Sequence, residues 1–236
     1  MAKAPLAGTV KTRLVPPLTS EEAAQLHVCF LRDMAASIAE VSVRDRAKGF
    51  VVYTPSGAEA TFDGILPSGF NLLRQRGESL GDRLCNASED LLEQGYSSWC
   101  LINSDSPTLP QVVLNLAIEA LSNDGDRVVL GAAADGGYYL IGLKNVHPRL
   151  FDRIAWSTSL VLAHTIERAA EIGIETQLLP TWYDVDDAVT LRQLCEELFL
   201  SRPRNGNYNA PHTRKYVARL IESGRIFPDL AGYITA

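Results

Sequence analysis

Apolar residues recur at two different periods along this chain, and the two periods alternate from the N-terminal part onward. Every fourth residue from Leu26 to Ile38 is apolar, and a capping box formed by Thr19 and Glu22 stands just before this stripe. The pattern predicts a helix over about residues 19–41 that packs one face on a sheet. Short apolar runs closed by proline or glycine follow, and they predict buried strands.

The other elements follow from the same two patterns. The predicted strands are residues 49–55, 71–75, 99–102, 127–133, 138–143 and 174–179. The predicted helices after the first are residues 77–95, 110–122, 158–172, 187–200 and 212–223. In the second helix the residues predicted to face inward are Leu80, Leu84, Ala87, Leu91 and Leu92. The run at 99–102 is apolar without alternation, which predicts a central parallel strand covered on both faces.

Strands that alternate with helices predict a three-layer α/β/α sandwich around a mostly parallel sheet. The sequence Asp135-Gly136-Gly137 separates two adjacent strands, so we expect a hairpin and one antiparallel strand. Residues 201–211 are rich in proline, asparagine, glycine and arginine, which predicts a linker. We therefore expect one domain over residues 1–200, followed by a linker and helical extension over residues 201–236.

Composition narrows the class of protein. Of 236 residues, 46% are apolar, which is enough for a large core, and the net charge of −6 argues against a nucleic-acid partner. The sequence shows no signal peptide and no apolar run of membrane-spanning length. Its four cysteines form no C-x-x-C pair, which predicts reduced thiols in the core of a cytoplasmic protein.

The first fourteen residues carry positive charge, although the chain as a whole is acidic. Three cations precede the first acidic residue, and glycine and threonine between them allow close backbone approach and add a hydroxyl donor. Such a loop suits the phosphates of a nucleotide, whereas the alternative is a basic and mobile chain end. An arginine after the strand at 71–75 is either a further phosphate ligand or a surface residue. The candidate phosphate-binding residues are Lys3, Gly8, Lys11, Thr12, Arg13 and Arg76.

Carboxylates follow two of the predicted strands. In an α/β sheet, ligands bind beyond the carboxyl ends of the strands. Asp105 follows the strand at 99–102, and Asp184 and Asp186 follow the strand at 174–179. Carboxylates that face a phosphate loop are suited to bind Mg²⁺ or Mn²⁺. The alternatives are a turn cap at Asp105 and a helix cap at Asp186 or Asp187.

A third group of residues suits the acceptor side of such a site. Asp135 offers a carboxylate, and Gly136 and Gly137 allow a ligand to approach the backbone. Tyr138 and Trp156 offer aromatic surfaces. The alternatives are an ordinary Asp-Gly hairpin turn and a core position for Trp156.

In this order, these segments resemble a family of bacterial GT-A-like glycosyltransferases, a branch of the nucleotide-diphospho-sugar transferase superfamily. The matching segments are Lys3-Ala-Pro, Gly8-Thr-Val-Lys-Thr-Arg-Leu14, Leu80-Gly-Asp-Arg-Leu84, Ser104-Asp-Ser-Pro107, Asp135-Gly-Gly-Tyr-Tyr-Leu-Ile-Gly142, Trp156-Ser-Thr158 and Asp184-Val-Asp186. Residues 11–14 are also similar to 2-phospholactate guanylyltransferases of the same superfamily. The resemblance implies the three-layer fold, a nucleotide-linked donor and a divalent cation held by Asp105 and by Asp186 or Asp184.

The sequence departs from the family pattern in two places. Ala7-Gly8 stands where the family has Pro-Gly, which makes the loop less rigid. The family also has an apolar strand before Lys3-Ala-Pro, whereas Met1 stands here where that strand should be ending. A central strand of about five buried apolar residues contributes roughly 8–15 kcal/mol. We therefore expect either that Met1 is not the natural start or that the sheet is incomplete.

These observations lead to one leading hypothesis and two alternatives. The leading hypothesis is a metal-dependent glycosyltransferase that uses a nucleotide-diphospho-sugar donor and a small-molecule acceptor. Asp105 and Asp186 would bind the cation, Lys11 and Arg13 would stabilise charge on the leaving nucleotide, and Asp135 would orient or deprotonate the acceptor. The first alternative is a guanylyltransferase-like nucleotidyltransferase that releases pyrophosphate from a nucleoside triphosphate. The second is a non-catalytic nucleotide-binding protein.

Overall fold

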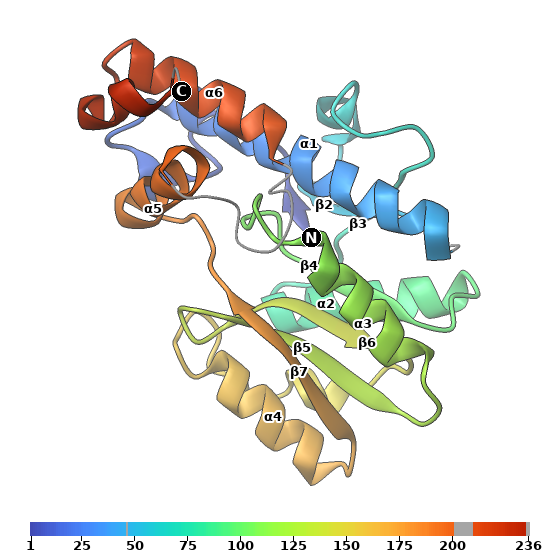
Figure 1. The fold of residues 1–236 in the computed structure, drawn as a ribbon. Helices are drawn as coiled ribbons and strands as arrows, with labels where there is room; N and C mark the ends of the chain where they lie inside the picture. The colour runs from blue at the N-terminus through green and yellow to red at the C-terminus, as the bar shows by residue number, and fades with distance from the viewer. Residues whose placement is uncertain (46, 201–209, 235–236) are drawn as a thin grey trace.

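The computed structural model describes residues 1–45, 47–200 and 210–234, which form strands enclosed by helices (Figure 1). The strands are β1 (Ala2–Lys3), β2 (Phe50–Thr54), β3 (Asn71–Arg74), β4 (Trp99–Ile102), β5 (Arg127–Ala133), β6 (Tyr138–Leu143) and β7 (Glu175–Trp182). The helices are α1 (Ser20–Asp45), α2 (Leu80–Glu93), α3 (Gln111–Ser122), α4 (Val161–Glu171), α5 (Ala188–Phe199) and α6 (Pro211–Glu222). The predicted alternation of strands and helices is confirmed.

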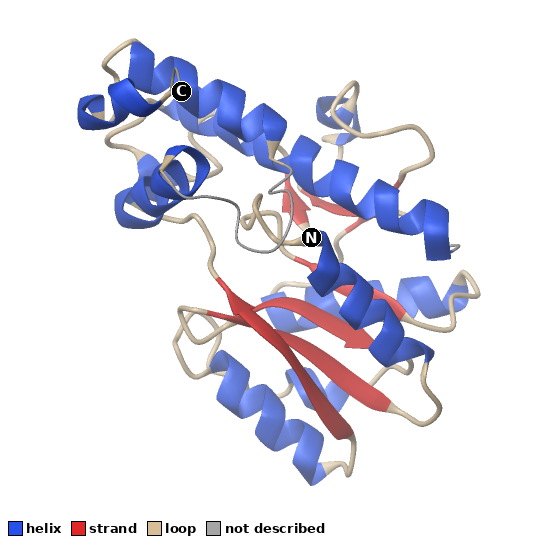
Figure 2. Ribbon diagram, viewed as in Figure 1, coloured by secondary structure: helices blue, strands red, loops and turns tan. Residues whose placement is uncertain are grey.

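The strands form two sheets (Figure 2). In the first, of order β1-β2-β3, both strand pairs are parallel. In the second, of order β4-β6-β5-β7, β6 runs antiparallel to β4 and β5, while β5 and β7 are parallel. The expected mostly parallel architecture with one antiparallel strand is confirmed in the part of the chain that the structure describes.

Helices cover both faces of the second sheet, which gives the predicted three layers. On one face, Val113 of α3 shares a buried cluster with Val129 of β5. On the other face, Leu84 of α2 and Ala169 of α4 share a cluster with Leu130 of β5. Successive residues of a strand point to opposite faces, so Val129 and Leu130 anchor the two outer layers.

The predicted central and parallel position of residues 99–102 is wrong. β4 lies at the end of the second sheet and pairs antiparallel with β6. Trp99 and Leu101 are buried, whereas Cys100 and Ile102 are half-buried. An apolar run indicates cover on both faces of a strand, but it carries no information about which neighbours the strand pairs with.

An apolar cavity of about 350 Å³ separates the two sheets. Its walls include Phe50 and Val52 of β2, residues of β4, and side chains of α1 and α3. Met1 and Ile102 also line this cavity, and the amino group of Met1 donates a hydrogen bond to the Ile102 carbonyl, 2.7 Å away. This contact links β1 of the first sheet to β4 of the second.

The long helix α1 begins at the predicted capping box and anchors the C-terminal helix, but Leu26 and Phe30 of its apolar stripe pack with α5 and α6 rather than on a sheet. Thr19 and Glu22 form the capping box, with the Thr19 amide 2.7 Å from the Glu22 carboxylate. Farther along α1, buried Asp33 accepts hydrogen bonds from the backbone amides of His212 (3.0 Å) and Thr213 (2.8 Å) at the start of α6. Burial raises the pKa of Asp33, and these bonds oppose that rise. In Figure 1, α6 lies alongside α1. Of the linker predicted over residues 201–211, residues 201–209 lie outside the described residues, and Pro211 is the first residue of α6.

The second helix differs from its predicted inward face at two positions. Leu84, Ala87 and Leu91 are buried, but Leu80 and Leu92 are 47% and 45% exposed. Leu80 is the first residue of α2. Leu92 lies about 100° around the helix from Leu91, because each residue turns the helix by that angle.

The cysteines are free thiols in the core, as the sequence predicts. Cys29 and Cys195 are buried, while Cys85 and Cys100 are half-buried. Burial raises the pKa of Cys29 to about 11 and those of Cys100 and Cys195 to about 12. These side chains are therefore protonated near neutral pH and act as small apolar residues.

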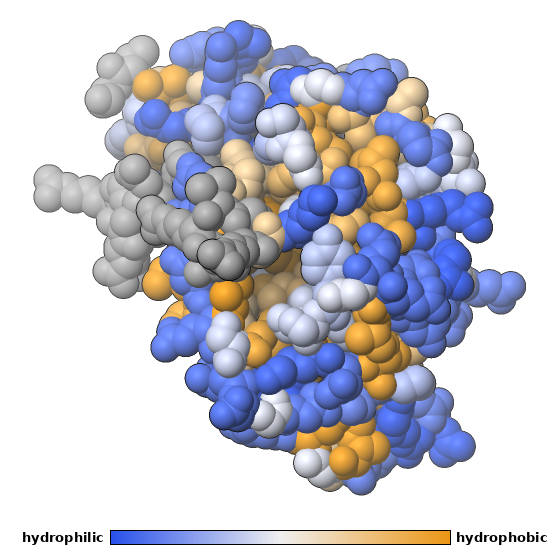
Figure 3. All heavy atoms as spheres, turned by 90° about the vertical axis from the view of Figure 1, so that its right-hand side faces the viewer, coloured by the Kyte–Doolittle hydropathy of each residue, from blue (hydrophilic) through white to orange (hydrophobic). Residues whose placement is uncertain are grey.

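The surface is mixed rather than dominated by one apolar face. On the side that Figure 3 shows, polar side chains cover most of the area and apolar ones form separate patches. Exposed large apolar residues come from different elements, such as Leu72 of β3, Leu116 of α3 and Leu178 of β7. Among the described residues, the helices are too short or too polar to cross a membrane.

Candidate nucleotide and cation site

The loops predicted to carry chemistry meet at one edge of the second sheet. Because β6 is antiparallel to both neighbours, β4 and β5 point the same way, and β7 is parallel to β5. Their carboxyl ends therefore open on a common edge, where ligands of α/β sheets bind. Backbone hydrogen bonds join the loops: the Val185 amide donates to the Asp105 carbonyl (2.9 Å), and the Ala134 amide donates to the Trp182 carbonyl (2.8 Å).

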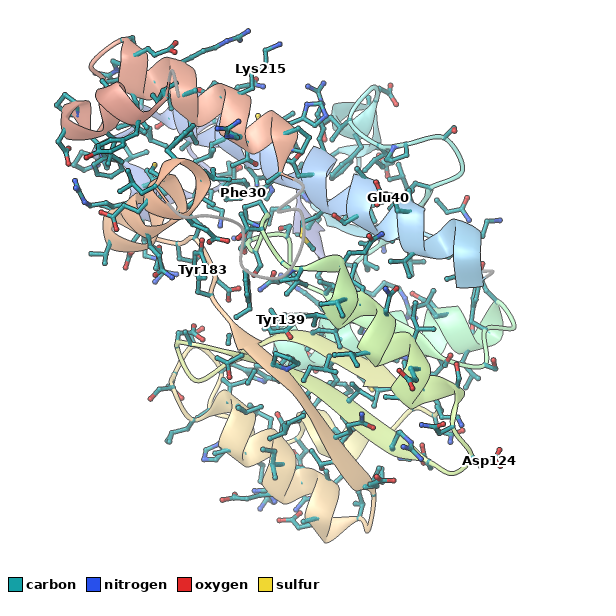
Figure 4. The ribbon with its side chains drawn as sticks, in the orientation of Figure 1. Phe30, Glu40, Asp124, Tyr139, Tyr183 and Lys215 are labelled. Carbon is teal, nitrogen blue, oxygen red and sulfur yellow. The ribbon has the colours of Figure 1, made fainter. Side chains whose placement is uncertain are left out.

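The N-terminal loop reaches the same edge from β1. Leu14, at the end of the short 3-10 helix η1 (Thr12–Leu14), is fully buried in an apolar cluster with Phe30 and Tyr183. Figure 4 shows Phe30 and Tyr183 near the middle of the molecule. The Lys11 side chain is only 4% exposed, and its ammonium lies 5.4 Å from the centre of the Phe30 ring. This packing does not fit the alternative of a mobile basic chain end.

Four charged side chains form the centre of the site, and we call them the charge cluster: Lys11, Arg13, Asp105 and Asp186. The Lys11 Nζ lies 2.5 Å from Asp105 Oδ1 and 3.1 Å from Asp186 Oδ1. It also donates a hydrogen bond to the Val185 carbonyl at 2.7 Å. Arg13 Nη2 lies 3.0 Å from the second oxygen of Asp186. The structure thus brings together two predicted phosphate ligands and two predicted metal ligands.

Opposing effects set the ionisation of the carboxylates. Burial alone would raise the pKa of Asp105, but the charge of Lys11, followed by His27, outweighs burial and lowers it. The pKa of Asp184 is raised, mainly by burial and further by the nearby carboxylates Asp105 and Asp186. Asp105 is therefore held as a carboxylate, which is the form that binds a cation.

Asp184 has a different set of partners from the other two carboxylates. Its Oδ1 accepts hydrogen bonds from Asn103 Nδ2 (2.7 Å) and Ser106 Oγ (2.6 Å). Asn103 and Ser106 flank Asp105 in the loop after β4, so these bonds fix the position of that loop. Sequence reasoning missed Asn103 and Ser106, although both lie in the segment that it selected. The role of Asp184 as a metal ligand stays a prediction.

A buried histidine beneath the N-terminal loop was also missed. His27 of α1 is 3% exposed, and its Nε2 lies 3.2 Å from the Lys3 carbonyl. Burial, together with the cations nearby, lowers the pKa of His27, although Asp105 opposes this effect. His27 therefore supports the backbone from which the cationic loop departs. Its position four residues before buried Leu31 was the available signal that it faces inward.

The residues present fit a divalent cation. Asp105, Asp186 and the Val185 carbonyl place three oxygen atoms around one positive atom, Lys11 Nζ. Oxygen ligands are those that Mg²⁺ and Mn²⁺ prefer. The described residues contain no group of three or more His, Cys, Asp or Glu side chains placed to hold a metal ion, so the side chains here supply two carboxylates at most. Because Mg²⁺ commonly takes one or two carboxylates and completes its shell with phosphate and water, a nucleotide would supply the remaining ligands.

The predicted acceptor-side turn adopts the expected hairpin. Gly136 has a φ of 91°, and the exposed Asp135 accepts a hydrogen bond from the Gly137 amide at 2.9 Å. The backbone carbonyl of Gly136 accepts from the Leu162 amide, which ties the turn to the start of α4. Tyr138 packs in the apolar cluster on that side of the sheet, and burial raises its pKa.

The remaining candidates lie in surroundings that fit the alternatives given for them, a surface position for Arg76 and a place against the core for Trp156. Arg76 pairs with Asp90 of α2, with Nη2 and Oδ1 separated by 2.5 Å. Trp156 lies against Gly81 of α2 and lines a separate cavity of about 660 Å³. Their roles in phosphate and acceptor binding stay predictions. The side chains of Lys3 and Thr12 are exposed, and Gly8 has a φ of 75° with open space around it.

Comparison with known proteins agrees with this geometry. Residues 37–158, more than half of the chain, match a family described as an uncharacterised protein conserved in bacteria (DUF2064). Among solved structures, the chain is similar to a candidate nucleotide-diphospho-sugar transferase from Desulfovibrio desulfuricans G20, with 30% identity and a TM-score of 0.76. The match covers 91% of this chain and 95% of that one. The chain therefore belongs to the DUF2064 family and has a nucleotide-diphospho-sugar transferase fold, which confirms the resemblance found in the sequence.

Two further solved structures are more distant. CMP:2-keto-3-deoxy-manno-octonic acid synthetase complexed with CTP has 14% identity and a TM-score of 0.46, over 68% of this chain and 85% of that one. The second, 4-diphosphocytidyl-2C-methyl-D-erythritol synthase, has 15% identity and a TM-score of 0.45, over 78% of this chain and 94% of that one. No curated protein matches the sequence.

Proposed function

We propose that this chain is a metal-dependent glycosyltransferase that uses a nucleotide-diphospho-sugar donor and a small-molecule acceptor. The observation that carries the proposal is the convergence of the Asp105 and Asp186 carboxylates on one positive atom, the Lys11 Nζ, at the carboxyl edge of the sheet. The D. desulfuricans relative, a candidate nucleotide-diphospho-sugar transferase, supports the same general activity.

In this proposal each side of the site has a distinct task. Mg²⁺ or Mn²⁺ held by Asp105 and Asp186 would neutralise charge on the departing nucleoside diphosphate. Arg13 is 73% exposed, so its guanidinium is free to turn from Asp186 to a phosphate oxygen. Asp135 is exposed at the neighbouring turn, where its carboxylate would orient an acceptor hydroxyl or take its proton.

The donor is to be identified first by binding. Nucleotides and nucleotide-sugars, each with Mg²⁺ or Mn²⁺, are screened for a rise in the thermal unfolding midpoint. A ligand present at 100 times its dissociation constant stabilises a protein by about 2.7 kcal/mol. We expect a nucleotide-sugar to give a rise that chelation of the metal abolishes. A rise that is equal with and without metal contradicts the cation site.

The products then distinguish the proposed reaction from its alternatives. With the donor identified by binding, we expect metal-dependent release of nucleoside diphosphate, measured by ion-exchange chromatography. Release of pyrophosphate from a nucleoside triphosphate would instead establish nucleotidyl transfer. Binding without release of either product across the acceptors tested would favour a non-catalytic nucleotide-binding protein.

A further inference from the structure

Lys11 is more buried and has more oxygen partners within the protein than a lysine that only binds phosphate would need. Its ammonium has three oxygen partners within 3.1 Å, one each from Asp105, Asp186 and Val185. Its side chain is 4% exposed, and the Phe30 ring lies beside the ammonium at 5.4 Å. An ammonium has three donors, so these three oxygens occupy them all. In this state Lys11 donates to a phosphate only by giving up at least one of these oxygens.

The charges of the cluster are balanced without a metal ion. Lys11 and Arg13 contribute two positive charges, and Asp105 and Asp186 contribute two negative ones. A bare divalent cation would have to enter beside a buried ammonium that already holds its ligands, and like charges at such short distances repel strongly. A diphosphate changes this balance, because its oxygens accept hydrogen bonds from the ammonium and share the cation.

The backbone at Lys11 indicates that its position depends on these contacts. Lys11 has a φ of 50°, in the left-handed region that side-chain-bearing residues rarely occupy. The contacts with Asp105, Asp186 and Phe30 offset that strain. Gly8, three residues earlier, also has a positive φ, and open space surrounds it. When a phosphate replaces the carboxylate partners, the contacts that hold Lys11 in this conformation are lost. The open space around Gly8 then allows the loop to change conformation.

We propose that the Lys11 ammonium is the resting occupant of the cation site, and that the divalent cation enters as a complex with nucleotide phosphates, which draw Lys11 away from Asp105 and Asp186. This inference rests on the proposed function and specifies the species that binds. The metal–nucleotide complex binds as one unit, whereas nucleotide and free metal do not bind one after the other. Lys11 thus acts as an internal counter-ion that keeps the free protein from taking up metal alone.

The test measures binding of Mn²⁺ alone, by the loss of the electron paramagnetic resonance signal of free Mn²⁺. We expect Lys11→Met to bind Mn²⁺ at least tenfold more tightly than the wild-type protein, because the variant removes the ammonium from both carboxylates and leaves only Arg13 beside Asp186. Lys215→Met is the matched control: Lys215 is exposed on α6, at the upper end of the molecule in Figure 4. The control is expected to bind Mn²⁺ as the wild-type protein does.

A second measurement does not depend on folding of the variant. In the wild-type protein, we expect Mn²⁺ alone to leave the thermal unfolding midpoint unchanged, whereas Mn²⁺ with inorganic pyrophosphate raises it by several degrees. Pyrophosphate stands in for the diphosphate of a donor whose base is unidentified.

A double variant locates the bound ion. Adding Asp105→Asn to Lys11→Met should abolish the tight Mn²⁺ binding, which places the bound ion at the charge cluster.

The outcomes separate this inference from the proposed function. Tight binding of Mn²⁺ alone to the wild-type protein, lost in Asp105→Asn, would overturn the role of Lys11 and leave the cation site in place. Equal affinities for wild-type protein and Lys11→Met would overturn it as well. Absence of any Mn²⁺ effect, with or without pyrophosphate, would overturn both the inference and the metal dependence of the proposed function.

Discussion

Replacing Asp105 with asparagine is expected to lower the turnover of the identified donor by about 10²- to 10³-fold, as loss of one preorganised electrostatic group in an active site typically does. The substitution replaces one carboxylate beside Lys11 with a neutral amide, so that Asp186 is the remaining carboxylate at this position. Asparagine has nearly the shape of aspartate, so the loss follows from charge. Release of nucleoside diphosphate at saturating donor is the measurement.

The matched control for this prediction is Asp124→Asn. It makes the same chemical change at an exposed residue, which Figure 4 places at the far end of the molecule from Phe30 and Tyr183. The control should keep wild-type turnover. Urea unfolding of Asp105→Asn verifies that the variant is folded. A folded Asp105→Asn protein with undiminished metal-dependent turnover would show that the carboxylate has no part in the chemistry.

Replacing Gly136 with alanine is expected to reduce the free energy of unfolding by about 2–5 kcal/mol, the sum of a left-handed backbone penalty and an overpacking penalty. A Cβ at Gly136 would lie 2.2 Å from the Ser159 carbonyl oxygen and 2.7 Å from its carbonyl carbon. These are backbone atoms, so they cannot turn aside as a flexible side chain would. The turn would have to move away from α4, carrying Asp135 and Gly137 with it.

Gly173→Ala provides the control for this clash. Gly173 also has a positive φ, 70°, but nothing lies within 4 Å of the Cβ position. Its replacement should therefore cost only the backbone penalty, about 1–2 kcal/mol. Urea titrations of the two variants and the wild-type protein give the comparison. Equal losses at the two positions would mean that the Asp135–Gly137 turn tolerates movement away from α4.

The sequence was sufficient for the features that depend on local pattern. The apolar stripe of α1, the capping box at Thr19 and Glu22, and the Asp135-Gly-Gly137 hairpin each lie within one short segment, and each is present. The placement of carboxylates after strands was also accessible, because parallel strands present their carboxyl ends at one edge.

Contacts between residues far apart in the sequence could not be predicted from local pattern. Lys11 and Asp186 are 175 residues apart, and spacing along the chain cannot show that their side chains touch. The sequence therefore assigned one to phosphate and the other to metal, whereas the structure pairs them. The end position of β4 and the packing of Trp156 on Gly81 were missed for the same reason: each depends on which element comes next in space.

The central claim is that Asp105 and Asp186 share one divalent cation with the phosphates of a donor. Anomalous diffraction from crystals grown with Mn²⁺ and the donor identified by binding tests it most directly. We expect a manganese peak about 2.0–2.4 Å from carboxylate oxygens of Asp105 and Asp186 and in contact with the diphosphate. A donor bound in the crystal with no manganese between these two carboxylates would contradict it.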